Sequence, residues 1–336
     1  MGLFLSPEAS AAELPCAKFA APTGSDANPG TAAAPFGTAQ KLVDSLSAGE
    51  AGCLREGAYA QNVKISVGGT GEGSRVTLRN YPGEEATLTG RLWIAAGADY
   101  VTVEGLFLNG TNAYNLPSPT VNADHAVFRR NDVTNDHTAI CFNLGHRTYG
   151  YADDTLIEAN RIHHCGVLPA ANHDHGIYVA RADGTVIRGN WIYENADRGI
   201  QLYPNAQNTT IAGNVIDANG EGIIFGGLGA DSSDHTRVSG NVITNSKIRY
   251  NVESYYDAGT PPGEDNFVTR NCISGGVRDS GNGGIAPSAI GFTATSNLTT
   301  PPLFFSRAQA DYRLAAGSAC AALVGSWSSL TPGPIA

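Results

Sequence analysis

The chain has 336 residues, of which 41 are glycine and one is methionine, and its formal net charge is −10. This acidic balance argues against a general nucleic-acid-binding protein, and no apolar run approaches the 18 or so residues of a membrane span. Valine, isoleucine, threonine and asparagine are plentiful, which indicates many strands and turns. Single globular cores stop growing at about 250–300 residues, so one core of this size requires an elongated architecture.

The N-terminal residues 1–17 contain no lysine or arginine and make a poor secretory signal, so we interpret the chain as a mature or trimmed form. The six cysteines fit no zinc-binding spacing. Cys16 and Cys53 flank the first expected strands and can be bridged. We interpret Cys141 and Cys272 as buried free thiols.

One short pattern recurs from residue 128 onward: an apolar residue, two small or polar residues, asparagine, any residue and a second apolar residue. An earlier copy, VEGLFL (103–108), has leucine in place of the asparagine. The asparagines follow one another at intervals of 29, 30, 24, 27, 30 and 26 residues. They are Asn131, Asn160, Asn190, Asn214, Asn241, Asn271 and Asn297.

Each part of this pattern has a physical reason. Apolar residues alternating at period two predict strands with one inward face. We expect the asparagine to adopt the left-handed conformation of the turn and its amide to bond the rungs above and below. A rung cannot bury its inner face alone, so the rungs must stack. The pattern therefore predicts an all-β, right-handed parallel β-helix, which is a solenoid of short strands.

A second strand follows several of the asparagines. We place these strands at TAICF (138–142), GIYV (176–179), GIQLY (199–203) and GIIFG (222–226). Before the second of them lies an insertion of about eight residues, within HHCGVLPAANHD (163–174). Long loops on a regular scaffold are where function usually lies.

These repeats resemble the pectate-lyase-like superfamily of β-helix proteins. FAAPTGSDANPGTAAAPFGTAQKLVDSL (19–46) resembles the first segment of many secreted members, which ends in a short capping helix. GCLREGAY (52–59) and VTLRNYPGEEATLTG (76–90) resemble the first two rungs, and DYRLAAGSACA (311–321) resembles the closing segment. The superfamily contains lyases, epimerases, glycoside hydrolases and phage tail proteins, so the resemblance is specific for the fold and weak for the activity.

The resemblance implies one solenoid domain over residues 1–336. We expect an N-terminal cap and first rung at 1–60, stacked rungs at 61–300 and a closing segment at 301–336. Secretion is inferred from the fold type. We expect a monomer whose partner is a polysaccharide, with neither nucleic acid nor a membrane involved.

Alignment of the second strands predicts columns of outward side chains about 4.8 Å apart. One column holds Asp136, Asp174, Asp197 and Gly220. The next holds His137, His175, Arg198 and Glu221. A third holds Ile140, Tyr178, Gln201 and Ile224. The columns predict one patch, overhung by the inserted loop, that consists of Asp174, His175, Tyr178, Asp197, Arg198, Gln201 and Tyr203.

Such a patch has the groups that β-elimination in a uronic-acid polysaccharide requires. A cation must neutralise the C6 carboxylate, a base must take the C5 proton, and an acid must protonate the departing O4. Arg198 suits the first role, as does a Ca²⁺ ion held by Asp174 and Asp197. His175 suits the base and Tyr178 the acid or an alternate base. We expect substrate contacts from the remaining polar residues, which are His137, His173, Gln201, Tyr203 and Glu221.

Other interpretations remain open at this point. The same groups serve a C5-epimerase. A glycoside hydrolase would use two carboxylates, either Asp174 with Asp197 or Glu221 with one of them. His173 and His175, two residues apart, can contribute to a transition-metal site. A non-catalytic carbohydrate-binding protein or adhesin would present aromatic residues, for which Tyr250, Tyr255 and Tyr256 are available.

Overall fold

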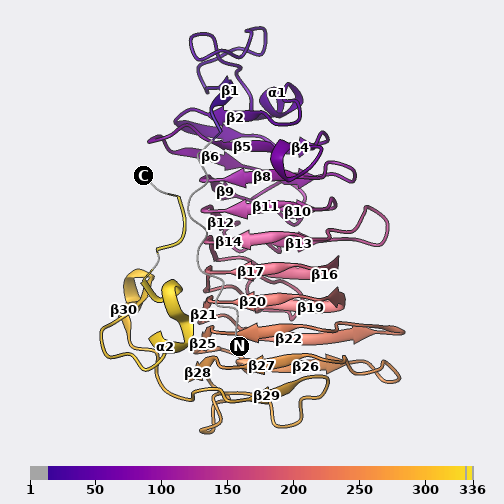
Figure 1. The fold of residues 1–336 in the computed structure, drawn as a ribbon, viewed down its shortest axis with the longest axis vertical. Helices are drawn as coiled ribbons and strands as arrows, with labels where there is room; N and C mark the ends of the chain where they lie inside the picture. The colour runs from indigo at the N-terminus through magenta and orange to yellow at the C-terminus, as the bar shows by residue number, and fades with distance from the viewer. Residues whose placement is uncertain (1–13, 330, 335–336) are drawn as a thin grey trace.

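The chain folds as a right-handed parallel β-helix in which short strands stack rung on rung along one long axis (Figure 1). The computed structural model describes residues 14–329 and 331–334. No helix in this part of the chain is long and apolar enough to cross a membrane.

Within the described residues, three long sheets form the walls of the solenoid. Sheet 1 has eleven strands. They are β1 (Cys16–Ala20), β2 (Ala51–Leu54), β5 (Val76–Asn80), β8 (Val101–Glu104), β11 (Val127–Arg129), β14 (Leu156–Glu158), β17 (Val186–Arg188), β20 (Thr210–Ala212), β24 (Arg237–Ser239), β27 (Phe267–Thr269) and β29 (Thr293–Thr295).

Sheet 2 follows sheet 1 in each turn of the solenoid and has nine strands in the described part of the chain. They are β3 (Gly57–Ala60), β6 (Ala86–Thr89), β9 (Phe107–Asn109), β12 (Asp132–Thr134), β15 (Arg161–His163), β18 (Trp191–Tyr193), β21 (Val215–Asp217), β25 (Val242–Thr244) and β28 (Cys272–Ser274).

Sheet 3 completes the turn and contains the longest strands. Its parallel strands are β4 (Val63–Ile65), β7 (Leu92–Ile94), β10 (Thr120–Val121), β13 (Phe142–Leu144), β16 (Ile177–Asp183), β19 (Arg198–Gln207), β22 (Glu221–Leu228) and β26 (Val252–Tyr256). The short strand β23 (Asp231–Ser232) pairs antiparallel with β22.

The two apolar positions of the repeat fill the interior, as the pattern predicts. On sheet 1 the first position is fully buried in Phe128, Ile157, Ile187, Ile211, Val238 and Val268. On sheet 2 the second position is buried to within 1 % of full burial in Val133, Ile162, Ile192, Ile216, Ile243 and Ile273. One apolar cluster runs through the stack from Ala20 to Ile273.

The repeated asparagines form a buried ladder at the turn between sheets 1 and 2. In Asn214, for example, the side-chain Oδ1 accepts hydrogen bonds from the backbone N and the Nδ2 of Asn190, both at 2.9 Å. Its own Nδ2 donates to the backbone oxygen of Ile187 at 2.8 Å and to Oδ1 of Asn241 at 2.9 Å. The same bonds recur from Asn131 to Asn297. The prediction that the amides bond neighbouring rungs is confirmed.

The prediction that asparagine itself takes the left-handed conformation is wrong. The positive φ lies at the residue before each asparagine, as at Ala159 (53°), Gly213 (66°) and Arg270 (58°). Turning the chain one residue earlier leaves the asparagine side chain pointing along the stack. Glycine is favoured just before three of the asparagines because it adopts this conformation without strain.

A helix caps the N-terminal end of the solenoid, and the closing segment packs along its side. The capping helix α1 (Ala39–Asp44) begins at Thr38, whose side chain accepts a hydrogen bond from the backbone N of Lys41, and it buries Leu42 and Val43 in the core. The closing segment contains the hairpin of β30 (Phe304–Ser306) and β31 (Asp311–Leu314), the helix α2 (Ala321–Val324) and two short 3₁₀ turns, Arg307–Gln309 and Gly325–Ser329. In Figure 1 this yellow segment lies beside the lower rungs, and its Tyr312, Val324 and Trp327 pack on sheet 2. A further 3₁₀ turn, Glu72–Ser74, lies near the N-terminal end of the solenoid.

The cysteines form three disulfides: Cys16–Cys53, Cys141–Cys165 and Cys272–Cys320. The bridge between Cys16 and Cys53 is as anticipated, but the free-thiol interpretation of Cys141 and Cys272 is wrong. Cys165 follows β15 by two residues and lies beside Cys141 of the preceding turn, and the closing segment brings Cys320 to Cys272, with Cα atoms 5.5 Å apart in both pairs. Neither approach is visible in the spacing of the cysteines.

We expect the purified protein to contain no reactive thiol before reduction and six after it. Thiol titration in denaturant, with peptide mapping under non-reducing conditions, measures this directly. Two titratable thiols in the unreduced protein would contradict the pairing of Cys141 with Cys165 or of Cys272 with Cys320.

Candidate functional site

One column of outward side chains runs the length of sheet 3. Strand pairing places these side chains in adjacent rungs in the order Lys64, Trp93, Thr120, Asn143, Tyr178, Gln201, Ile224 and Glu253. They point outward because the residues on either side of them are inward and buried, such as Ile177 and Val179 around Tyr178. The predicted alignment of Tyr178, Gln201 and Ile224 is therefore confirmed.

The predicted alignment of the first rung is wrong by three residues. Phe142, not Ala139, pairs with Ile177, so Asn143 takes the place expected for Ile140. The turn before β13 is longer than expected because Asn135 holds it, with its Nδ2 donating to the backbone oxygen of Ala139 at 2.6 Å.

His137 is consequently outside the column of His175. It has a left-handed φ of 59°, and its Nδ1 lies 3.0 Å from the backbone oxygen of Gly166. Its ring packs against that of His164. His137 thus belongs to a histidine cluster at the start of the inserted loop, where His163 also bonds Asp132 at 2.8 Å.

His175 and Tyr178 form the centre of the predicted patch. Their rings meet edge to face, with centroids 5.4 Å apart. His175 is 2 % exposed, and burial, followed by the positive charge of Arg198, holds the pKa of its imidazole well below the usual range. Its Nδ1 is buried without a hydrogen-bond partner. His175 is therefore neutral at physiological pH.

Tyr178 is partly exposed, unlike His175. Burial raises the pKa of the Tyr178 hydroxyl to about 12, and Tyr203 acts in the same direction. The positive charges of Arg198 and Arg181 oppose this shift in the pKa. The hydroxyl thus feels the positive charge of both arginines, and as a partly exposed titratable group it is the candidate of the patch for proton transfer.

Arg198 is 5 % exposed and fully engaged. Its Nε lies 3.2 Å from Oε2 of Glu221 in the next rung. Its Nη1 and Nη2 donate to the backbone oxygen and side-chain oxygen of Asn172, at 2.8 and 2.5 Å. The inserted loop is therefore held down on Arg198, as the overhanging loop of the prediction requires.

Asp197 and Asp174 also hold the inserted loop. Oδ2 of Asp197 accepts hydrogen bonds from the backbone N of His173 at 2.8 Å and of Asp174 at 3.1 Å. Burial raises the pKa of Asp174, and a hydrogen bond from the backbone of Val167 opposes this. The imidazole of His173 is exposed on the same loop.

This arrangement does not fit a calcium site. A carboxylate oxygen that already accepts two backbone amide hydrogen bonds is poorly available as a cation ligand. Nor do the described residues include any group of three or more His, Cys, Asp or Glu side chains that could hold a metal, at His173 and His175 or elsewhere.

Two further charged residues complete the patch and were missed by the sequence interpretation. Arg249 bridges two buried carboxylates, with Nε 3.0 Å from Oε1 of Glu221 and Nη2 2.6 Å from Oε1 of Glu253. Burial, followed by repulsion from Glu221, raises the pKa of Glu253 to about 7. Burial also raises the pKa of Glu221, against the pull of Arg198 and Arg249. The strand VESYY (252–256) was assigned only to an aromatic surface, although its alternation places Glu253 outward.

The aromatic residues near this end differ in exposure. Tyr255 is 55 % exposed, whereas Tyr203, Tyr250 and Tyr256 are only partly exposed. Tyr203 follows Gln201 along β19, and burial raises the pKa of its hydroxyl. These tyrosines do not form a flat, fully exposed surface.

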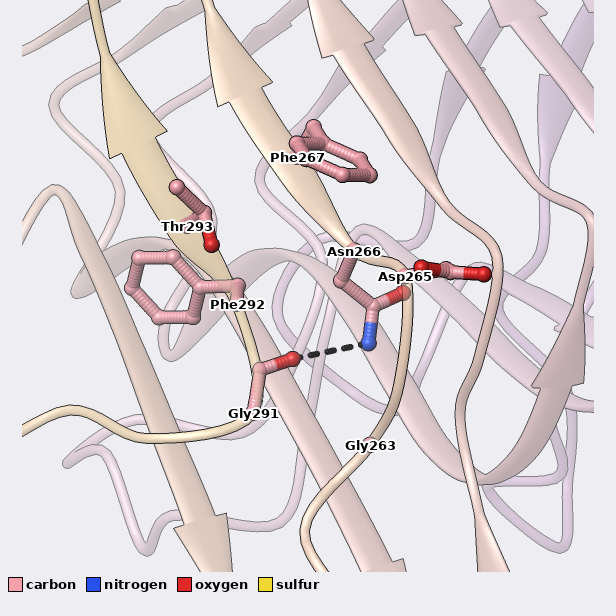
Figure 2. A pocket seen from close by; sticks show the side chains of 7 residues that line it. All are labelled: Gly263, Asp265, Asn266, Phe267, Gly291, Phe292 and Thr293. Atoms are coloured by element: carbon pink, nitrogen blue, oxygen red, sulfur yellow. Dashed lines mark hydrogen bonds between the residues drawn. The ribbon is translucent and has the colours of Figure 1, made fainter.

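A pocket elsewhere on the solenoid lacks this chemistry. Figure 2 shows it around Asn266, whose Nδ2 donates to the backbone oxygen of Gly291 at 2.9 Å. Its lining residues are Gly263, Asp265, Asn266, Phe267, Gly291, Phe292 and Thr293. They include one carboxylate and no cation, so the pocket is a poor candidate for elimination chemistry.

The raised pKa of Glu253 predicts a pH-dependent stability. The pKa of Glu253 is near 4.5 in the unfolded chain and about 7 in the folded protein, so between these pH values the folded protein binds one more proton than the unfolded chain. The stability that this proton confers is lost as the pH rises through this range. Between pH 5 and pH 8, we expect the free energy of unfolding of Glu253→Gln to rise by roughly 2 kcal/mol relative to that of the parent protein. Urea unfolding at both pH values measures this, and His175 contributes equally to both proteins.

The matched control is Glu264→Gln, which removes an exposed carboxylate. Its stability relative to the parent should not change with pH. An equal pH response in both variants would show that Glu253 ionises as an ordinary surface carboxylate.

Comparisons with known proteins agree with this architecture. The sequence profile of a family described as "Right handed beta helix region" matches residues 105–284, which is more than half of the chain. No curated protein sequence matches the chain significantly.

Solved structures with the same fold include three enzymes. The crystal structure of pectate lyase Pel9A has a TM-score of 0.65 at 13 % identity, covering 90 % of both chains. A rhamnogalacturonan lyase has a TM-score of 0.53 at 14 % identity, covering 87 % of this chain and 91 % of the other. An alginate lyase from Paenibacillus sp. has a TM-score of 0.50 at 16 % identity, covering 77 % and 96 %. At these identities the likeness establishes the fold alone.

Proposed function

The chain belongs to the family of right-handed β-helix proteins, and from this premise we propose that it is a polysaccharide lyase that cleaves a uronic-acid-containing chain by β-elimination. The observation that carries the proposal is the position of Tyr178. Its partly exposed hydroxyl lies on the outward column of sheet 3, beside a neutral imidazole and under the influence of two arginines. That solved structures named as lyases of pectate, rhamnogalacturonan and alginate share the fold is additional support.

The reaction removes the C5 proton, forms a C4–C5 double bond and breaks the bond between C4 and O4. Tyr178 is the proton-transfer group. When ionised, its oxygen accepts the C5 proton, and the phenol that results protonates the departing O4. Arg198 and Arg181 favour the ionised form, which keeps the Tyr178 pKa from rising further. Their positive charge also stabilises the negative charge that develops on the C6 carboxylate.

His175 and Arg198 act from beneath the inserted loop. Neutral His175 has the protonation state of a base, but at 2 % exposure it contacts the substrate only if the inserted loop, residues 163–174, moves. With the inserted loop held on Arg198 as in this structure, His175 is a positioning residue beside Tyr178. Gln201, Tyr203 and Glu221 surround the same point of the column. His173 is available on the loop itself.

A glycoside hydrolase is the second candidate, and one observation favours it. Glu221 and Glu253 are paired through Arg249, and the pKa of about 7 at Glu253 suits a general acid. This pair replaces the predicted pair of Asp174 and Asp197, whose carboxylates hold the loop. A C5-epimerase would use the same groups around Tyr178 as the lyase.

We also propose that the protein is secreted. Three disulfides in one chain are typical of an oxidising compartment. A polysaccharide substrate outside the cell is consistent with that location.

The test is incubation of the protein with pectate, alginate, glucuronan and glycosaminoglycans, with Ca²⁺ or with chelator. Ultraviolet absorbance of the unsaturated uronate and new reducing ends are followed together. A lyase produces both, a hydrolase produces reducing ends alone, and an epimerase produces neither while changing the C5 configuration seen by NMR. We expect both signals, and we expect them to survive the chelator because Asp197 is engaged by the loop backbone. Loss of activity in chelator would restore the calcium hypothesis.

A further inference from the structure

Two cations near the N-terminal end of sheet 3 lie against one indole ring. Lys64 in β4 and Trp93 in β7 are register partners on the outward column. The Nζ atom of Lys64 lies 4.8 Å from the centroid of the Trp93 ring, and the Cζ atom of Arg91 lies 5.0 Å from it. The ring is itself oriented, because its Nε1 donates to Oδ1 of Asn122 at 2.9 Å. The three side chains form a preorganised positive site, which we call the Trp93 cation site.

Neither cation has a carboxylate partner among the residues that the structure describes. Nη2 of Arg91 donates to the hydroxyl of Thr120 at 3.2 Å, and Nε of Arg91 is buried without a hydrogen-bond partner. Elsewhere in this acidic protein, arginines such as Arg55, Arg181 and Arg188 contact carboxylates. Burial lowers the pKa of Arg91.

Burying a positive charge costs free energy unless an anion pairs with it. Cation–π contact with Trp93 offsets part of the cost, and it leaves Nη1 of Arg91, which has no hydrogen-bond partner among the described residues, available for an anion. Tyr149 adds an exposed ring at the same place, 58 % exposed and edge-on to Trp93 with centroids 6.5 Å apart. A carboxylate attached to a sugar ring matches a guanidinium beside an exposed aromatic ring.

The position of the site relates it to Tyr178. Trp93, Thr120, Asn143 and Tyr178 occupy consecutive rungs of the column. Three rung spacings put the Trp93 cation site about 14 Å from Tyr178 along the solenoid axis. Between them, Asn143 is partly exposed, whereas Thr120 is buried and hydrogen-bonded to Arg91 and to the backbone oxygen of Pro117. A polysaccharide chain lying along the column would contact both places at once.

We propose that Lys64, Arg91 and Trp93 form a distal subsite that binds the carboxylate of a uronate unit several sugars away from the bond at Tyr178. This proposal deepens the proposed function and rests on it for the identity of the substrate. The subsite holds the acidic polymer along sheet 3. It contributes to binding and takes no part in the chemical step.

The test is a binding measurement on the full chain carrying Tyr178→Phe, so that substrate is not consumed. Calorimetry with oligosaccharides of pectate, alginate and glucuronan is compared with a neutral xylan oligosaccharide. Arg91→Gln and Lys64→Gln are introduced separately, since exposed Lys64 can be replaced without risk to the fold. The matched control is Arg237→Gln, which removes an arginine held against Phe267 at 4.5 Å on sheet 1.

We expect Arg91→Gln to raise the dissociation constant for the preferred uronate by about tenfold, the loss typical of a hydrogen bond to a charged group. Lys64→Gln should raise it by less, and Arg237→Gln should leave it unchanged. Added salt should weaken binding of the parent more than binding of Arg91→Gln. Equal binding by the parent and Arg91→Gln, equal binding of the neutral oligosaccharide, or no uronate binding at all would overturn the subsite.

Its failure is distinguishable from failure of the proposed function. If uronans are cleaved and Arg91→Gln leaves KM unchanged, the lyase stands and the subsite is wrong. If no uronan is cleaved but uronate binding depends on Arg91, the subsite stands and the lyase is wrong. With both correct, Arg91→Gln raises KM and leaves kcat nearly unchanged, because the contact lies away from the reacting atoms.

Discussion

Tyr178→Phe is expected to lower the rate of uronan cleavage by about 10²–10⁴-fold, the usual contribution of a positioned acid or base. The change removes only the hydroxyl. The ring contact with His175 remains, and the neighbouring inward residues Ile177 and Val179 stay buried. Initial rates from the ultraviolet absorbance of the product measure the effect, with thermal melting to confirm that the variant is folded.

The matched control is Tyr255→Phe, which removes a hydroxyl from an exposed tyrosine further along the same sheet. Its rate should stay within about twofold of the parent, because surface changes away from a site have small effects. His175→Gln and Arg198→Gln should reduce the rate and shift its pH profile, since both groups influence the charge around Tyr178. Full activity of Tyr178→Phe would remove Tyr178 from the mechanism.

Asn214→Ala is expected to destabilise the solenoid by about 3 kcal/mol, the largest stability effect that we predict. The substitution deletes five hydrogen bonds at a fully buried position and leaves the backbone N of Asn190 without its acceptor. A buried donor without a partner carries its full desolvation cost. The midpoint of urea unfolding, monitored by circular dichroism, measures the loss.

Asn297→Ala provides the comparison, because Asn297 ends the ladder and is only partly buried. Water can replace its hydrogen bonds, so the expected loss is about 1 kcal/mol. Equal losses at Asn214 and Asn297 would show that position in the ladder is unimportant. The two variants together test whether the interior of the stack is held by this ladder.

The fold was predictable from the sequence because every rung repeats the same local signal. Apolar residues such as Ile187 and Ile192 alternate on either side of Asn190, and the spacing of the asparagines sets the length of a turn. Stacked rungs contact mainly their neighbours, so local patterns determine most of the architecture. The left-handed residue was misplaced by one position because several of these turn residues, including Ala159 and Arg270, are not typical turn formers.

The candidate site was predictable only in part. The positions of Tyr178, Gln201, Arg198 and Glu221 follow from aligning the sequence on Gly176, Gly199 and Gly222. His137 was misplaced because the length of its turn depends on the side chain of Asn135.

Other features of the site depend on loop conformation. The contact of Asn172 with Arg198 is set by the path of the inserted loop, which has no periodic signal. Arg249 was missed for the same reason, because it precedes β26 in an irregular segment.

The locations of two disulfides bear on how the molecule resists digestion. A stack of rungs opens most easily at its ends, where a terminal strand has only one neighbour. Cys16–Cys53 ties β1 to β2 at the first rungs, and Cys272–Cys320 ties β28, the last strand of sheet 2, to the closing segment beside it. We expect these two bridges to suppress fraying of the terminal rungs, so that a protease must wait for the interior of the stack to open. Reduction of the two bridges should therefore make the ends of the stack the first sites of cleavage.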